Sequence, residues 1–412
     1  MYVMALNCGS SSLKYQIFDT DTKSVIVGGT VEKIGFSDSF MTQKYPDGKK
    51  ERKDVEMKNH NEALGVVMSM LQSANIDTNA ISAVGHRVVH GGEKYNCSIE
   101  ITDADIKAID ELAKLAPLHN PANLAGIIAL RAVLPNAKHV AVFDTAFHQT
   151  MPDYAYRYAV PAAWYKDLGV RKYGFHGTSH LYVSKRAAAM LGKPAKECNI
   201  ISMHIGSGAS ACAIKNGVSV DTSMGMTPLS GLTMGTRPGD IDPGVVLYVM
   251  DRLGLDTKEM SVRLNKQSGH IGVTECFDDR RDLEENMGKN DTCRLSLDIE
   301  ANRVRQYIGA YMATLGHTDA IVFTAGVGER DDILRRKEME GLEELGIKFD
   351  RELSDKALTQ LGAGESVIST PDSKVKVFMI PTNEELVIIE DTIAILNGTY
   401  KPNHLEMGYS FV

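Results

Sequence analysis

The stretch YVMALNCGSSSLKYQIFD, from Tyr2 to Asp19, decides the fold, because it reads as two apolar strands around a Gly/Ser turn. Its glycine, three serines and lysine suggest a phosphate cradle. However, a P-loop needs G-x-x-x-x-G-K-[ST] before a helix, and here Lys14 precedes Tyr15 and a strand. Two interpretations stay open at this point: a phosphate site of another kind, or only a tight turn.

A second stretch repeats the same plan about 200 residues later. NIISMHIGSGASACAIKNG, Asn199–Gly217, again places an apolar strand on each side of a turn rich in glycine and serine. Two such hairpins suggest two related domains that face each other, although two unrelated hairpins would give the same pattern.

Helical and strand patterns alternate along the rest of the chain, which predicts an α/β fold. Apolar residues recur at helical spacing from Leu64 to Leu71, Val183 to Leu191, Val304 to Leu315 and Leu386 to Leu396. Short apolar runs predict strands that end at Asp144, at a glycine turn in AIVFTAGVGE (320–329), and at Pro381.

Composition limits the class of protein. The 412 residues are 43% hydrophobic and 24% charged, with a net charge of −8, so there is no basic excess for nucleic acid or an acidic membrane. Six scattered cysteines form no C-x-x-C pair, which favours a reducing compartment and argues against zinc. With neither a basic leader nor a membrane-length apolar run, we expect a soluble cytoplasmic protein.

Several polar clusters could bind anions. Backbone N–H groups could converge in the turns at 7–14, 204–210 and 326–329, and each has a plain hairpin turn as its alternative. Arg87 lies between two histidines, His176 and His180 lie in RKYGFHGTSH, and Arg237 lies in GTRPGDIDPG. A solvated arginine or a core histidine is the plain alternative for each.

Carboxylates follow two predicted strands. Asp144 closes an apolar strand, where ligands of open α/β sheets collect. Glu384 and Glu385 follow another strand and a proline, although an acidic first helical turn would explain them equally well. The run DDRRD, 278–282, could be only a solvated charge cluster.

Taken together, these segments resemble the acetate kinase family, within the actin/Hsp70/sugar-kinase fold group. The resemblance rests on motifs that occur in order along nearly the whole chain: LNCGSSSLKYQ, GHRVVHGGEKY, LAPLHNPANLAGI, VAVFDTAFHQTMP, RKYGFHGTSHLYVS, DTSMGMTPLSGLTMGTRPGDIDPG, FTAGVGE and IPTNEE.

The resemblance implies a two-domain ribonuclease H-like fold with an active-site cleft between the domains. The first domain would comprise 1–150 plus 386–412, and the second, 151–385, would bind the nucleotide and form a homodimer. The implied reaction is reversible phosphoryl transfer from ATP to acetate, giving acetyl phosphate and ADP with Mg²⁺, for which Mn²⁺ can substitute. Because the attacking carboxylate is already ionised near pH 7, positioning and positive charge matter more than a base.

The resemblance also implies residue roles. Arg87 would hold the acyl group, Arg237 and His176 the transferring phosphoryl group, and Asp144 would be the family's catalytic aspartate, as a base or only as an orienting group. Asn7 and Glu384 would position Mg²⁺. The apolar pocket for the methyl group would comprise Val89, Leu118, Phe175 and Pro228, with His119 beside it. The nucleotide would meet Asn7, Ser10, Ser12, Lys14, His204, Gly206, Ser207, Gly208, Asp279, Arg280, Arg281, Gly326, Val327, Gly328, Glu329 and Arg330.

The chain departs from the family pattern at three positions. Ser207 and Arg330 each replace an asparagine, and Arg280 replaces an aromatic residue. All three lie on the nucleotide side, which leads to the hypothesis that the preferred phosphoryl donor differs from ATP, with GTP, ITP or pyrophosphate as candidates.

Other functions remain as alternatives. Propionate or another short-chain acid differs from acetate by as little as one methylene, worth only about 1–3 kcal/mol, and Val89 favours acetate modestly. A non-catalytic ATP-binding protein of the actin or Hsp70 kind would have no reason to combine Arg87, His176 and Arg237. A sugar kinase would need a polar pocket and a basic aspartate.

Overall fold

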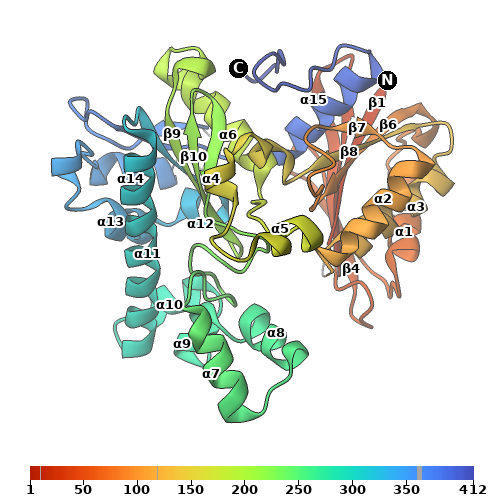
Figure 1. The fold of residues 1–412 in the computed structure, drawn as a ribbon. Helices are drawn as coiled ribbons and strands as arrows, with labels where there is room; N and C mark the ends of the chain where they lie inside the picture. The colour runs from red at the N-terminus through yellow and green to blue at the C-terminus, as the bar shows by residue number, and fades with distance from the viewer. Residues whose placement is uncertain (10, 118, 360–363) are drawn as a thin grey trace. The chain divides into compact units, whose positions relative to one another are not determined.

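The computed structural model describes residues 1–9, 11–117, 119–359 and 364–412, which form two compact units. Unit 1 comprises Met1–Phe147 and Asn383–Phe411, and unit 2 comprises His148–Thr382 with the terminal Val412. The chain therefore passes into unit 2 after Phe147 and returns to unit 1 after Thr382 (Figure 1).

Unit 1 is built on an eight-stranded mixed sheet in the order β5-β4-β3-β2-β1-β6-β8-β7. Its strands are β1 (Tyr2–Cys8), β2 (Ser12–Asp19), β3 (Ser24–Glu32), β4 (Phe40–Lys44), β5 (Lys50–Asp54), β6 (Ile81–Val88), β7 (Ile99–Glu100) and β8 (Lys138–Phe143). Strand β1 pairs antiparallel with β2 and parallel with β6, and β6 pairs parallel with β8. Three neighbouring parallel strands thus end at one edge of the sheet.

Both faces of this sheet are covered, which explains why β1 is apolar at nearly every position. Side chains alternate across a strand, so Met4 and Leu6 join one core cluster while Val3 and Ala5 join another. Helices α1 (His60–Ser73) and α3 (Asn120–Val133) cover the first face together with α2 (Asp103–Glu111), and α15 (Glu384–Leu396) covers the second (Figure 1).

Unit 2 repeats this plan with a six-stranded sheet in the order β11-β10-β9-β12-β14-β13. Its strands are β9 (Ile200–Ile205), β10 (Ala209–Lys215), β11 (Val218–Thr222), β12 (Ala320–Thr324), β13 (Ser366–Val367) and β14 (Lys376–Met379). As in unit 1, an antiparallel hairpin, β9–β10, continues into two parallel strands, β12 and β14. The repeat expected from the two Gly/Ser hairpins is therefore present, and the α/β ribonuclease H-like class is confirmed.

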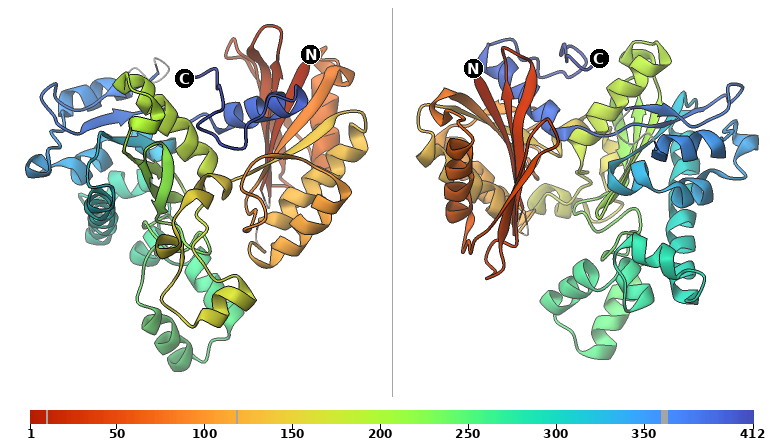
Figure 2. Two further views of the ribbon diagram at one scale, coloured as in Figure 1. Left: turned by 45° about the horizontal axis from the view of Figure 1, so that its top comes forward. Right: turned by 180° about the vertical axis from the view of Figure 1, so that it is seen from behind.

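The helices of unit 2 are more numerous. They are α4 (Asp153–Tyr156), α5 (Ala162–Leu168), α6 (Gly177–Leu191), α7 (Pro243–Leu253), α8 (Thr257–Lys266), α9 (Gly269–Thr274), α10 (Arg280–Asn286), α11 (Asp291–Leu315), α12 (Ala325–Arg330), α13 (Asp332–Met339) and α14 (Arg351–Thr359). Helix α6 packs on β9 and β12, and α11 packs on β9 and β10. Helices α7 to α10 gather near one end of α11 (Figures 1 and 2).

One local prediction is wrong. The sequence predicts a glycine turn after AIVFT, but residues Ala325–Arg330 form the short helix α12. The sharp bend lies at Ala325, whose φ of 67° is in the left-handed region that non-glycine residues seldom adopt. The glycines that follow instead lie within the helix, where Gly328 is buried.

No helix in the described ranges has both the length and the apolar composition needed to cross a bilayer.

Candidate active site

Three predicted residues of unit 1 meet at the carboxyl edge of its parallel strands. Asn7 lies near the end of β1, Arg87 near the end of β6, and Asp144 directly after β8. The register places Arg87 beside Val142 and Val88 beside Phe143, so the two charged side chains emerge from neighbouring strand ends. Such edges are where open α/β sheets bind ligands.

Arg87 and Asp144 form a two-pronged ion pair. Arg87 Nε and Nη2 donate to the two Asp144 oxygens at 2.8 and 2.5 Å, and the Asp144 side chain is only 1% exposed. Burial opposes the charged form of Arg87, but the carboxylates of Asp144, Glu384 and Glu385 outweigh it and raise the Arg87 pKa. With both oxygens bonded to Arg87, Asp144 is placed to orient the guanidinium.

The first turn of α15 adds carboxylates to the same region of unit 1. Asn383 caps the helix by accepting from Leu386 N, so the chain enters the helix at Glu384. Glu385 Oε1 lies 3.6 Å from Lys14 Nζ, and Lys14 pairs across the hairpin with Asn7. Direct contact, strand pairing or electrostatic interaction thus connects one group of polar side chains in unit 1. This group comprises Asn7, Lys14, Arg87, Asp144, Glu384 and Glu385.

The Gly9–Ser12 turn uses one of its own amides to close the hairpin. Gly9 N–H donates to Ser12 O at 2.8 Å, and His60 Nε2 lies 2.7 Å from Gly9 O. The Gly9 amide is therefore not available to a phosphate, although Ser12 itself is exposed. Ser10, predicted to contact the nucleotide, lies outside the described residues.

Two asparagines of α3 hold this edge together, and sequence reasoning assigned them no role. Asn123 Nδ2 donates to Cys8 O at 2.7 Å, and its Oδ1 accepts from Val89 N at 3.0 Å. Asn120 pairs with both the N–H and the C=O of His90. The sequence did contain one feature that could have indicated this role. The LAPLHNPANLAGI motif places Asn120 and Asn123 about one helical turn apart at the start of the helix.

In unit 2, three predicted residues converge. His176 has a left-handed φ of 57° at the start of α6, a conformation seldom found outside functional or turn positions. A methyl group placed on Gly208 would lie 3.5 Å from His176 Nε2 and 3.9 Å from Arg237 Nη1. The backbone of the HIGSG turn, an imidazole and a guanidinium therefore surround one small space.

Arg237 differs from Arg87 in its partners. Its Nη1 lies 3.3 Å from Pro228 O and 3.7 Å from Met234 Sδ, and it forms no ion pair within the described part of the chain. Burial lowers the pKa of this guanidinium. A desolvated cation without a carboxylate partner is suited to bind an anion from solution.

The loop that carries Arg237 is firmly held. Gly269 packs so closely that a methyl group there would lie 2.0 Å from Met234 O. Asp240 accepts from Gly231 N at 2.8 Å through Oδ1 and from Tyr307 Oη at 2.6 Å through Oδ2. These contacts are consistent with the turn predicted around Arg237, and they come from Gly269 of α9 and Tyr307 of α11.

His204 and Glu329 belong to a second group in unit 2. The His204 ring stacks on His176 at 4.1 Å between centroids, and its Nδ1 lies 2.7 Å from Ser179 Oγ. Ser179 in turn bonds Thr382, whose N–H donates to Glu329 Oε1 at 3.1 Å. Burial raises the pKa of Glu329.

The positions that depart from the family pattern differ in exposure. Ser207 and Arg330 are exposed, whereas Arg280 is only 6% exposed and forms ion pairs with Glu300 and Asp331. Arg280 therefore contributes to the packing of α10, α11 and α13. Asp279 caps α10 and binds Arg281, which is the main reason why its pKa falls to about 2.

A buried arginine, Arg335, contacts the α12 segment of the predicted nucleotide site. Arg335 Nη1 donates to Gly328 O at 2.8 Å, and Arg335 Nε donates to Ser354 Oγ at 3.0 Å. Gly326 lies exposed and Val327 half-buried on the same short helix. The sequence offered no signal for Arg335, because one arginine among several on α13 looks like a solvated residue.

The residues predicted to form an apolar pocket fall in both units. Val89 and Phe175 are buried, while Pro228 and His119 are half-buried. Leu118 lies outside the described residues.

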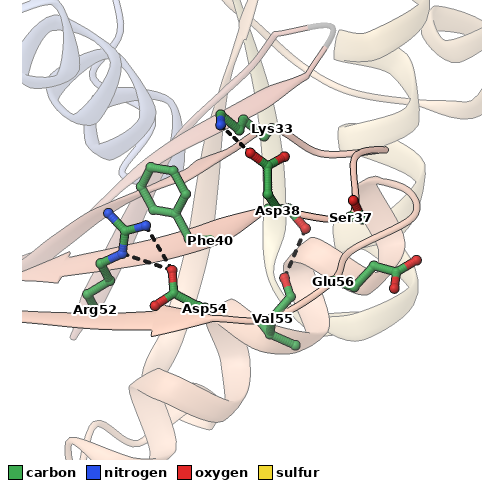
Figure 3. A pocket seen from close by; sticks show the side chains of 9 residues that line it. Lys33, Ser37, Asp38, Phe40, Arg52, Asp54, Val55 and Glu56 are labelled. Atoms are coloured by element: carbon green, nitrogen blue, oxygen red, sulfur yellow. Dashed lines mark hydrogen bonds and ion pairs between the residues drawn. The ribbon is translucent and has the colours of Figure 1, made fainter.

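Two hollows lie elsewhere on unit 1. One, of about 370 Å³, is lined by Lys33, Ser37, Asp38, Ser39, Phe40, Arg52, Asp54, Val55 and Glu56 (Figure 3). Four of its charged side chains form ion pairs with each other, since Lys33 pairs with Asp38, and Arg52 pairs with Asp54 while stacking on Phe40. The other, of about 350 Å³, includes Lys14 and Glu385 and so borders the predicted site.

Comparison with known proteins identifies the family of this chain. Residues 2–390 match the model of the Acetokinase family. An acetate kinase of Geobacter sulfurreducens is 55% identical over all of this chain and 98% of its own length.

Solved structures are similar over the same extent. The acetate kinase of Porphyromonas gingivalis has a TM-score of 0.89 at 44% identity, covering 96% of this chain and 99% of its own. A propionate kinase of Francisella tularensis also has a TM-score of 0.89, at 37% identity and the same coverage. The chain therefore belongs to the acetokinase family.

Proposed function

We propose that the protein transfers the γ-phosphoryl group of ATP to acetate, reversibly, giving acetyl phosphate and ADP. The observation that carries the proposal is the half-buried Arg237 guanidinium, without a carboxylate partner in the described residues, beside His176 Nε2 and the Gly208 backbone. Family membership supplies the reaction class, and this grouping supplies a place for a transferring phosphoryl group.

In this mechanism Arg87 binds the carboxylate of acetate, and Asp144 holds the Arg87 guanidinium in its orientation. One acetate oxygen attacks the γ-phosphorus, a P–O bond forms, and the bond to ADP breaks. No proton needs to be removed, because acetate is ionised near pH 7. The ion pair of Asp144 with Arg87 therefore supports the orienting role over the role of a base.

Arg237 and His176 bind the equatorial oxygens of the transferring group. Charge spreads over those oxygens in the transition state, so pre-placed donors stabilise it more than they stabilise the bound substrates. A guanidinium suits this task because it stays charged and can bind two oxygens at once.

Asn7 and Glu384 are suited to Mg²⁺, with Mn²⁺ as a substitute. An amide oxygen and a carboxylate are the hard donors that these ions prefer, and Mg²⁺ usually takes few protein ligands beside water and phosphate. The ion would neutralise phosphate charge, while Lys14, beside Glu385, adds a cation of the chain's own.

The nucleotide lies along the turns of unit 2 near His204, Gly206 and α12. Because Arg280 is buried in ion pairs, we attribute any difference in donor preference to the exposed Ser207 and Arg330.

We further propose a cytoplasmic homodimer. All six cysteines are free thiols, which suits a reducing compartment. Helix α7 is mainly apolar yet buries none of its residues within one chain, and Leu247, Tyr248 and Leu253 are each more than 60% exposed. An apolar helix face of this kind is suited to cover the same face of a second copy.

The test is an acyl phosphate assay with hydroxylamine trapping, across acetate and propionate as acceptors and ATP, GTP, ITP and pyrophosphate as donors. The proposal expects acetate with ATP to give the highest kcat/KM. ATP turnover without acyl phosphate would instead indicate a protein of the actin or Hsp70 kind. A higher kcat/KM with propionate, or with another donor, would overturn the corresponding substrate assignment alone.

A further inference from the structure

A chain of four side chains extends from His176 into the core of unit 2. His176 Nδ1 lies 2.8 Å from Ser210 Oγ, and the same oxygen lies 2.8 Å from His180 Nε2. His180 Nδ1 then lies 2.6 Å from Ser202 Oγ. His180 belongs to α6 and His176 is the N-cap residue of that helix, while the hydroxyls belong to β9 and β10.

His180 is an uncharged link in this chain. Its side chain is fully buried, and burial, with His148 and His204 nearby, lowers its pKa well below the usual range. A neutral imidazole has one N–H donor and one bare nitrogen acceptor. Therefore, whichever role Nδ1 takes, Nε2 takes the opposite one.

Ser202 sets the direction of the chain. Its hydroxyl is fully buried, and His180 Nδ1 is its one hydrogen-bond partner among the residues described. If Ser202 accepted from His180, its own O–H would be buried without an acceptor, which costs free energy. Ser202 therefore donates to His180 Nδ1, and the ring proton of His180 lies on Nε2.

The remaining bonds follow in order. His180 Nε2–H donates to Ser210 Oγ, so the Ser210 hydroxyl proton is free to point to its other partner, His176 Nδ1. A doubly protonated His176 would force Ser210 to accept twice and would leave the Ser210 proton without an acceptor. The ring proton of His176 thus lies on Nε2, the nitrogen that faces Gly208 and Arg237.

We propose that Ser202, His180 and Ser210 are positioning residues that fix His176 in its Nε2–H tautomer, so that it donates a hydrogen bond to the transferring phosphoryl group. The opposite tautomer would present a lone pair to anionic oxygens, which repel it. This inference rests on the function proposed above for His176, since an Nε2–H donor is useful only where an anion binds.

The tautomer can be measured without any catalytic turnover. In the full-length protein, selectively ¹⁵N-labelled at histidine and otherwise deuterated, two-bond ¹⁵N–¹H spectra distinguish protonated from bare ring nitrogens. The His176 signals are assigned by their loss in His176→Ala. We expect a bare Nδ1 and a protonated Nε2, and an Nδ1–H ring in the wild-type protein would overturn the proposal.

Kinetics test whether the chain acts through His176. Ser210→Ala should lower kcat about tenfold to a hundredfold with little change in KM, less than the roughly 10²–10³-fold cost of losing a transition-state donor. In a His176→Ala background the same substitution should have no further effect on kcat. Ser219→Ala is the matched control, since Ser219 is a buried serine 2.9 Å from another buried histidine, His148.

The possible results distinguish a positioning role from a structural role, and the hydrogen-bond order from the proposed function. An equal loss from Ser210→Ala with and without His176, or an equal loss in Ser219→Ala, would indicate a structural role and overturn the proposal. If Ser210→Ala fails to fold, Ser202→Ala and the wild-type spectrum still decide. A wild-type protein that makes no acyl phosphate yet shows the Nε2–H ring would reject the proposed function but not the hydrogen-bond order.

Discussion

At the scale of single residues, the two arginines predicted for the site differ in their hydrogen-bond and ion-pair partners. Arg87 is already bound by Asp144, so an acetate bound there as proposed would meet a guanidinium with a fixed orientation. Arg237 contacts only a carbonyl and a thioether, and its charge is uncompensated by any carboxylate in the described residues. The fixed orientation of Arg87 favours binding in one geometry. The uncompensated charge of Arg237 favours a strong attraction to negative charge that develops near it.

Arg237→Ala should therefore lower kcat by about 10²-fold or more while changing the KM for acetate little, because the lost contact acts mainly in the transition state. Arg237→Lys should recover only part of kcat, since an ammonium keeps the charge but loses the forked geometry. The measurement is steady-state kinetics with Arg294→Ala as control, because Arg294 is 60% exposed on α11. A full kcat in Arg237→Ala would contradict the role.

Arg280 gives a second prediction, which concerns stability. Arg280→Phe removes the cation that Glu300 and Asp331 share, and breaking a buried ion pair in this way typically costs about 3–5 kcal/mol. We expect a much lower melting temperature and an unchanged preference between ATP and GTP. The neighbouring Arg281→Ala is the control, because Arg281 is 85% exposed and solvent screens its surface pair with Asp279, so this variant should melt close to the wild type.

A stable Arg280→Phe protein with a changed nucleotide preference would show the opposite: that this residue contacts the donor.

The sequence alone could not predict whether Arg280 is a structural or a nucleotide-binding residue, because Glu300 and Asp331 approach Arg280 from α11 and from the start of α13. Its partners are 20 and 51 residues away in the chain. The same limit applies to Asn123, whose partner Cys8 ends β1 and whose partner Val89 directly follows β6.

At the scale of elements, α15 connects the predicted site to the end of the chain. Its first turn carries Glu384 and Glu385, and its inner face packs on the sheet at Gly85, where a methyl group would lie 2.3 Å from Thr392 Oγ1. Farther along, Asp391 is buried and accepts from Ser98 Oγ at 2.6 Å and Tyr409 Oη at 2.9 Å. One helix thus links the predicted site, the sheet and residues 409–411 of unit 1.

Asp391 makes stability depend on pH. Burial raises its pKa from 3.8 to about 6, against the effect of its two hydroxyl donors, so the folded state holds this proton more tightly than the unfolded chain. Stability should therefore fall as pH rises from about 4 to about 6, by about 3 kcal/mol in total. Asp391→Asn should remove that fall.

The measurement compares urea midpoints of the wild-type and Asp391→Asn proteins from pH 4 to 7. The variant should gain stability relative to the wild type across the window and keep the gain above it. Glu344→Gln, at an exposed position, serves as the control for loss of one charge. A constant difference between the Asn variant and the wild type at every pH would contradict the prediction.

Elements with strong periodicity were predictable from the sequence. The apolar stripes ending at Leu191 and Leu315 correspond to α6 and α11, each followed by glycine, as a helix stop requires. The residues around Gly326 were predicted as a turn because glycine usually interrupts helices. There the bend fell on Ala325 instead, since packing against β9 and β12 determines where the chain turns.

At the scale of the whole molecule, the six strands of unit 2 follow the same order as six strands of unit 1, β3-β2-β1-β6-β8-β7. The predicted site residues lie close in sequence to both points where the chain changes unit. Asp144 lies three residues before Phe147, and Glu384 lies two residues after Thr382. Hairpin repeats in the sequence were enough to suggest the duplication. The sequence could not indicate that the apolar side of α7 is exposed, because such a helix has the same apolar pattern as a helix packed in a core.

Association between copies gives the fourth prediction. A double variant with Leu247→Asp and Tyr248→Asp should shift the protein from the mass of two chains to that of one in light scattering, because charges replace apolar surface at the proposed contact. Ile128→Asp, a 51% exposed apolar position on α3 of unit 1, should leave the mass unchanged. A wild-type protein already at the mass of one chain would rule out the dimer.

The return of α15 to unit 1 has a consequence for how the protein is made. Domains of a nascent chain usually fold from the N-terminus onward. Here Val3, Ala5, Val140 and Val142 form their core cluster with Ile388 and Ile389, which follow residues 148–382 of unit 2 along the chain. Residues 148–382 of unit 2 are therefore synthesised before that cluster can close, and until then α15 cannot cover this face of the unit 1 sheet.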